Sequence, residues 1–74
     1  MLATVLESTV LAAAVYDPLA HRLWLEFRSG PVYCYSDVPP TVYQGMIEAP
    51  SKGAYFNRSI RGRFAYHLQA DPNQ

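Results

Sequence analysis

Residues 21–35 read HRLWLEFRSGPVYCY and contain the clearest secondary-structure pattern of the chain. Apolar and polar side chains alternate on both sides of Ser29-Gly30, a dipeptide typical of a turn between strands. Strict alternation indicates strands with one buried face, because successive side chains of a strand point to opposite faces of a sheet. The stretch therefore predicts a β-hairpin with strands over about 22–28 and 31–35.

The length of the hairpin turn decides which side chains share a face. With a two-residue turn at Ser29-Gly30, Trp24 lies with Tyr33 and Tyr35 on a face rich in aromatic and charged groups. With a three-residue loop that holds Gly30 in a left-handed conformation, the register moves by one residue. Both tyrosines then join the apolar side chains of the first strand in the core. The sequence is compatible with both registers.

Two helices are predicted after the hairpin. A Pro-Pro pair favours a helix start, and apolar residues at i, i+1, i+4 and i+5 form one stripe over residues 41–49. Ser51 is a good N-cap for a second helix over residues 52–61, which repeats this spacing and ends before Gly62. Each helix thus has one apolar face to bury.

Alternation also predicts a strand before the hairpin, over residues 9–16, and a last strand over residues 63–68. The predicted fold class is α+β, a small antiparallel sheet of three to four strands in the order β-β-β-α-α-β with two short helices packed on one face. We expect one domain over residues 1–68 and a disordered tail over residues 69–74.

Composition limits the classes of function. The chain has 74 residues with six basic and six acidic side chains, so it is short for more than one domain and lacks the net positive charge of a protein that coats nucleic acid. Its single cysteine, Cys34, excludes an internal disulfide and a multi-thiolate metal site. The histidines and acids show no catalytic or metal-ligand spacing, so we predict no enzyme, metal or cofactor. The absence of targeting and membrane-spanning segments predicts a cytoplasmic location without membrane partners.

The charges are unevenly distributed. Residues 1–51 hold two basic against five acidic side chains, whereas residues 52–74 hold four basic against one acidic and several aromatic rings. A basic segment with interleaved rings is typical of single-stranded nucleic-acid binders, although the rings also suit a core. The candidate nucleic-acid-binding residues are Tyr33, Tyr35, Trp24, Lys52, Arg58, Arg61 and Arg63.

A local anion site is also predicted at the start of the second helix. Backbone N–H groups and the helix dipole favour a phosphate at a helix N-terminus. The candidate residues are Ser51, Lys52, Gly53 and Arg61. The alternative is structural, with Ser51 capping the helix and Gly53 allowing close packing.

The sequence also resembles a known family. The match covers about residues 8–68 and rests on Ser8, Tyr16-Asp17, Leu23, Phe27, Ser29-Gly30, Tyr33-x-Tyr35, Val38-Pro39, Ala49, Ser51-Lys52-Gly53, Tyr55-Phe56-Asn57 and Ile60-Arg61. In these positions the chain resembles the KTSC domain, a module found at the C-terminus of some lysyl-tRNA synthetases and in small bacterial or phage proteins. The resemblance implies the fold and, through the synthetases, suggests RNA binding.

These observations predict a small binding module with weak affinity for single-stranded RNA or DNA. Local basic residues would contact phosphates, and strand tyrosines would stack on bases. The alternative is a protein-interaction module or homodimer that uses an exposed aromatic sheet face, because so small a core gains stability from a partner.

Overall fold

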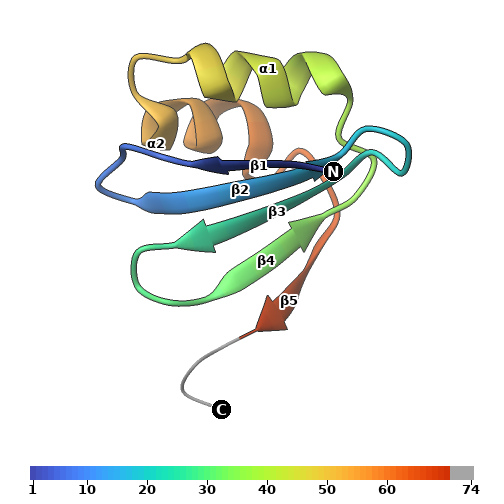
Figure 1. Ribbon diagram of the computed structural model, residues 1–74, viewed down its shortest axis with the longest axis horizontal. Helices are drawn as coiled ribbons and strands as arrows, with labels where there is room; N and C mark the ends of the chain where they lie inside the picture. Colours follow the sequence, from blue (N-terminus) through green and yellow to red (C-terminus); the bar gives the residue numbers. More distant parts are fainter. Residues whose placement is uncertain (71–74) are drawn as a thin grey trace.

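The computed structural model describes residues 1–70. Five strands form one antiparallel sheet in the order β1-β2-β3-β4-β5. They are β1 (Leu2–Val5), β2 (Leu11–Asp17), β3 (Arg22–Phe27), β4 (Val32–Tyr35) and β5 (Tyr66–Ala70). The helical segments α1 (Pro40–Glu48), α2 (Lys52–Tyr55) and η1 (Phe56–Ile60) connect β4 to β5 and pack on one side of the sheet (Figure 1). None of the helices in this described part is long and apolar enough to cross a membrane.

The α+β class is confirmed, but the predicted number and order of strands were wrong. The chain adds β1 before the three predicted strands, so the order is β-β-β-β-α-α-β. This strand lies at the sheet edge and most of its side chains are exposed, so its sequence lacks the alternation that marks a half-buried strand. The last strand, β5, includes two residues of the predicted tail, while residues 71–74 lie outside the described residues.

The hairpin has the three-residue loop. Leu25 pairs with Tyr33, and the Phe27 N–H donates to the carbonyl of Pro31 over 2.9 Å. Gly30 closes the loop with a φ of 118°, a conformation that side chains disfavour. Both strand tyrosines therefore face the helices, which excludes the two-residue alternative.

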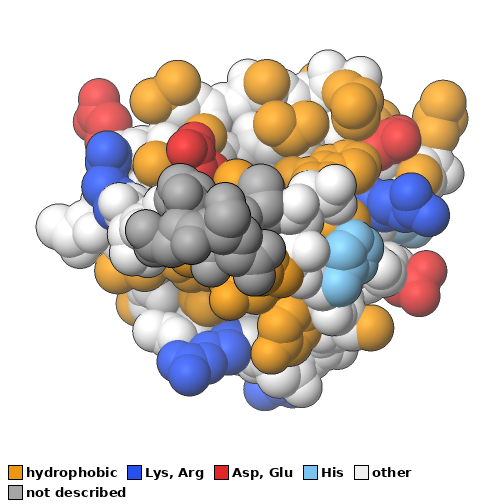
Figure 2. All heavy atoms as spheres, turned by 90° about the horizontal axis from the view of Figure 1, so that it is seen from below, with side chains coloured by type: hydrophobic (Ala, Val, Ile, Leu, Met, Phe, Trp, Pro, Cys, Tyr) orange, Lys and Arg blue, Asp and Glu red, His pale blue; other side chains and the backbone are white. Residues whose placement is uncertain are grey.

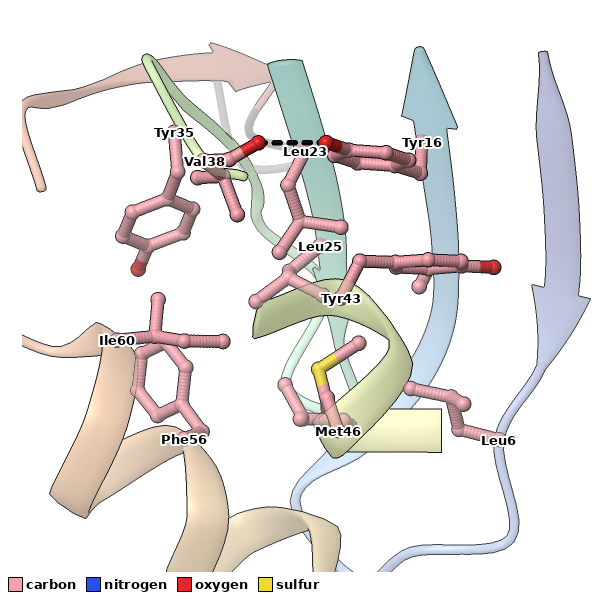
Figure 3. Close-up of a cluster of buried hydrophobic side chains, with 12 residues drawn as sticks. Leu6, Tyr16, Leu23, Leu25, Tyr35, Val38, Tyr43, Met46, Phe56 and Ile60 are labelled. Atoms are coloured by element: carbon pink, nitrogen blue, oxygen red, sulfur yellow. Dashed lines mark hydrogen bonds between the residues drawn. The ribbon is translucent and has the colours of Figure 1, made fainter. Parts of the chain in front are cut away.

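The core lies between the sheet and the helices (Figure 3). Tyr16 occupies its centre, where its ring stacks on Tyr43 with centroids 4.6 Å apart. The Tyr16 hydroxyl donates to the Val38 carbonyl over 2.6 Å, so its only polar group is satisfied. The buried residues of this core are Leu6, Leu11, Ala14, Tyr16, Leu23, Leu25, Tyr35, Val38, Tyr43, Met46, Phe56 and Ile60. Cys34 is also buried, but it lies on the other face of the sheet, where it pairs with Trp24.

The predicted helices form, but the second is not uniform. The first matches α1 within one residue at each end. In the second, Ser51 caps α2 by accepting from the Ala54 N–H, and the chain then widens into the π-helical η1. The Arg61 N–H donates to the Phe56 carbonyl, five residues earlier, over 2.8 Å. Such π segments often lie at functional sites.

Gly45 allows the two helical segments to approach closely. The Tyr55 ring crosses α1 at this residue, and its hydroxyl donates to the Val42 carbonyl over 3.0 Å. A Cβ atom at position 45 would lie 2.8 Å from the ring carbon that bears the hydroxyl, closer than real Cβ contacts. The contact fixes the start of η1 against α1 and so places the residues described next.

Candidate functional site

A cavity of about 520 Å³ lies between η1 and strands β3 to β5. Its volume is within the range of small-ligand sites. The cavity is lined by Val10, Phe27, Tyr33, Tyr35, Phe56, Asn57, Arg61, Gly62 and Tyr66. We call it the aromatic cavity, because five of these nine residues carry aromatic rings.

The five rings support one another around the aromatic cavity. Phe56 from η1 meets Phe27 and Tyr35 edge to face, with centroids 5.3 and 5.8 Å apart. Tyr33 meets Phe27 and Tyr66 in the same way, at 5.7 and 5.6 Å. Edge-to-face packing is the favoured geometry for such pairs, so the walls are preformed. Figure 3 shows how the Tyr35 ring extends from its strand toward Ile60 and Phe56.

Polar groups lie at the rim of the aromatic cavity. The Arg61 guanidinium donates to the Asn57 side-chain oxygen over 3.4 Å, and both residues are exposed. Gly62 follows with a φ of +74° and turns the chain back toward β5. The arrangement is an apolar, ring-lined hollow with a permanent positive charge and an amide at its edge.

Tyr35 carries the most perturbed ionisation of the aromatic cavity. Burial, followed by the neighbouring hydroxyls of Tyr66 and Tyr33, raises the pKa of Tyr35 to about 12. Arg61 acts in the opposite direction and lowers this pKa, which places its charge close to the phenol. The cavity therefore holds Tyr35 as a neutral hydroxyl over the physiological pH range.

The raised pKa of Tyr35 predicts a loss of stability in alkaline solution. An unfolded tyrosine titrates near pH 10, so the unfolded state gains phenolate before the folded state does. The contribution is complete below about pH 10 and is lost as the pH rises toward about 12. Tyr35→Phe should flatten this decline, as measured by urea unfolding at a series of pH values. Equal declines in variant and wild type would contradict the prediction.

The structure brings part of the predicted nucleic-acid set together. Tyr33, Tyr35 and Arg61 line the aromatic cavity. Arg58 and Arg63 belong to the same segment: the Arg63 side chain donates to the Arg58 carbonyl over 3.2 Å. All three arginines are exposed. In the view of Figure 2, the visible basic side chains stand apart from one another, and hydrophobic side chains reach the surface between them.

Two predicted residues lie elsewhere. Trp24 pairs with Cys34 on the face of the sheet away from the helices, because the three-residue loop puts it opposite to the tyrosines. The Lys52 ammonium donates to the Ala49 carbonyl over 3.0 Å and is half-buried. The structure therefore does not bring Trp24 or Lys52 to the tyrosines, and a role for either in nucleic-acid binding stays a prediction.

The predicted phosphate site is not assembled. The Ser51 hydroxyl oxygen caps α2 by accepting from the Ala54 N–H, which is the structural role predicted for it as the alternative to phosphate binding. Ser51, Lys52 and Gly53 line a second hollow of about 440 Å³, which also contains the acidic Glu7. Arg61 lines the aromatic cavity instead, because the π turn of η1 separates it from the start of α2.

Part of the aromatic cavity lies outside the predicted candidate residues. The predicted candidate residues do not include six that line it: Val10, Phe27, Phe56, Asn57, Gly62 and Tyr66. Asn57 lies at the rim, where its side-chain oxygen accepts a hydrogen bond from Arg61. The three-residue loop is the sequence feature that could have identified Phe27, because this register places Phe27 beside Tyr33. The π turn that positions Asn57 has no comparable pattern in the sequence.

Residues 1–70 hold no group of three or more histidine, cysteine, aspartate or glutamate side chains that could bind a metal ion. Cys34 is buried, and burial raises the pKa of its thiol, while Arg22 lowers it. A thiol with a raised pKa is a poor nucleophile.

Comparisons with known proteins agree with one family. The KTSC domain model matches residues 7–64. A lysine–tRNA ligase of Nostoc sp. is 45% identical over 60 residues, which are 81% of this chain and 11% of the ligase, so the chain spans about a tenth of that relative. A protein of Stutzerimonas stutzeri is 43% identical over 66 residues and is 93% covered.

The fold comparison points the same way. The crystal structure of a KTSC domain protein from Yersinia pestis matches with a TM-score of 0.89 and 29% identity, over 93% of this chain and 97% of that one. Since the family model spans most of the chain and the fold of that domain is reproduced, the chain belongs to the KTSC domain family.

Proposed function

We propose that this domain is a non-catalytic module that binds single-stranded RNA, with one unpaired base in the aromatic cavity and adjacent phosphates on Arg58, Arg61 and Arg63. The observation that supports it is a ring-lined hollow with Arg61 at its rim. Proteins recognise unpaired bases by stacking them on aromatic rings and by contacting the backbone with arginine. The two features lie side by side here.

The exposed ring of Tyr66 is the base-stacking group of this proposal. Its exposed fraction is 59%, and it stands on the edge strand beside the more buried Tyr33 and Tyr35. Those inner rings form the floor, and the neutral Tyr35 hydroxyl offers a hydrogen bond to a base edge. A base entering the cavity would thus meet the exposed ring of Tyr66 and a floor made of the more buried rings.

The charges predict a weak and salt-sensitive interaction. Arg58 lies over the Tyr55 ring at 5.6 Å, and Arg61 and Arg63 contact an amide oxygen and a carbonyl oxygen. These partners are neutral, so the three positive charges remain to attract phosphates. Three phosphate contacts on a single strand give a slope of log affinity against log salt of about −2.

The relatives support RNA over other polyanions. Matching segments belong to lysine–tRNA ligases, enzymes whose name states that they act on a transfer RNA. We therefore take RNA as the ligand and single-stranded DNA of the same sequence as the comparison.

The test is an amide NMR titration with a mixed-sequence single-stranded RNA at low and near-physiological salt. Tyr66→Ala should weaken binding about tenfold through lost stacking. Leu68→Ala is the matched control, because Leu68 lies on the same strand and face but does not line the cavity. Absence of salt-sensitive shifts around the cavity at low salt, or equal effects of the two variants, would contradict the proposal.

A further inference from the structure

The face of the sheet away from the helices carries a row of mostly apolar residues, called here the apolar row, that crosses all five strands. The strand register aligns Ala3, Val15, Trp24, Cys34 and His67, one residue from each strand. Directly paired residues point to the same side, and this side is opposite to the core tyrosines. No helical segment of residues 1–70 lies over this row (Figure 1). We call this side the open face.

Opposite charges flank the row at equal distances. Arg22 and Glu26 lie two residues before and two residues after Trp24 on the central strand β3, and both are exposed. Because side chains two residues apart share a face, all three point to the open face. Along the central strand of the open face, a positive charge (Arg22), an aromatic ring (Trp24) and a negative charge (Glu26) therefore follow one another.

We propose that the open face binds a second copy of this chain. Two sheets that pack face to face lie about 10 Å apart, within reach of long side chains from both. A twofold axis that runs along the apolar row sets the two β3 strands antiparallel. Trp24 then meets its symmetry mate, and Arg22 of each copy lies opposite Glu26 of the other. A twofold interface must be self-complementary in this way.

The two charges of β3 favour this arrangement. An axis parallel to β3 would bring Arg22 against its own symmetry mate and Glu26 against its own, and both contacts would be repulsive. With the axis along the row, both contacts are attractive, and Trp24 and its symmetry mate lie between them. A partner of single-sign charge would match only one end of β3, whereas a second copy matches both.

Sedimentation equilibrium of the full chain tests the proposal. We expect the wild type to dimerise and Trp24→Asp to remain monomeric, since a central tryptophan carries much of the energy of an interface. Arg22→Glu and Glu26→Arg should each weaken self-association about tenfold, because two attractive pairs become repulsive. Mixing the two variants should restore dimers, since one copy then carries two acidic groups and the other two basic groups.

The charge-reversal variants also distinguish a twofold axis along the apolar row from a twofold axis parallel to β3. With the axis parallel to β3, the single charge reversals would leave self-association unchanged, which would overturn the proposal. Arg58→Glu, the same reversal on the helical side, is the control and should have no effect. A wild type that stays monomeric at about 1 mM would exclude the dimer. Far-UV circular dichroism verifies that each variant is folded.

Discussion

Replacing Tyr16 with alanine is expected to unfold much of the protein at room temperature. The side chain is 1% exposed, stacks on Tyr43 and donates a 2.6 Å hydrogen bond to Val38. Removal of a buried ring costs about 3–5 kcal/mol, and a carbonyl left without its donor adds about 1–3 kcal/mol. Domains of this size are stabilised by little more than roughly 5 kcal/mol. Urea unfolding followed by circular dichroism measures the loss.

Tyr16→Phe separates the hydrogen bond from the ring. It keeps the stack on Tyr43 and removes only the hydroxyl, so the melting temperature should fall by about 5–15 °C. Tyr66→Phe is the matched control, because the exposed Tyr66 ring lies outside the core and its change should have little effect on melting. A Tyr16→Phe variant as stable as the wild type would show that the Val38 bond does not contribute. If Tyr16→Ala lowers the free energy of unfolding by less than about 2 kcal/mol, Tyr16 is not the central residue of the core.

The regular elements could be predicted because their patterns are local. Alternation along residues 21–35 and the apolar stripes after Pro40 and Ser51 each require only neighbouring residues. The missing strand β1 shows the limit. Its side chains are largely exposed, so its backbone pairs with β2 without a periodic burial pattern. Pairing at a sheet edge is a property of the backbone and has little sequence signal.

One residue of loop length decided the composition of the aromatic cavity. Ser29-Gly30 is compatible with a two-residue turn, but the left-handed Gly30 closes a three-residue loop. That choice turns Tyr33 and Tyr35 toward the helices and Trp24 away from them. The π turn of η1 then sets Arg61 at the rim and away from Ser51. Both features depend on tertiary packing and lie outside what local patterns encode.

Core packing and ligand binding are not exclusive explanations for the tyrosines. Tyr35 is 4% exposed and belongs to the core cluster, yet it lines the aromatic cavity. The Phe56 side chain, which is 6% exposed, likewise belongs to the core cluster and lines the aromatic cavity. A ring held by the core on one side can present its edge to a ligand on the other. Variants of these two rings would therefore change stability and binding together, so exposed rim residues give cleaner tests.

Arg61→Glu is expected to cause the largest loss of RNA binding among the rim variants. The change removes a charge-assisted contact to phosphate and adds a repulsive charge, which together weaken binding on the order of a hundredfold. Arg61 is exposed, and its side-chain contact is a 3.4 Å hydrogen bond to Asn57, so the fold should be retained. The slope of log affinity against log salt should become shallower by about 0.7, the value of one phosphate contact.

Arg22→Glu is the matched control, because it makes the same change on the face opposite to the aromatic cavity and should leave RNA affinity nearly unchanged. Alkaline titration of Tyr35 provides an internal check without RNA. Since Arg61 lowers the pKa of Tyr35, the Arg61→Glu variant should ionise this tyrosine at higher pH than the wild type. If the Tyr35 titration shifts while RNA affinity stays the same, Arg61 lies at the aromatic cavity but the cavity does not bind RNA. If both arginine variants weaken RNA binding equally, the interaction depends on total charge and no base occupies the cavity.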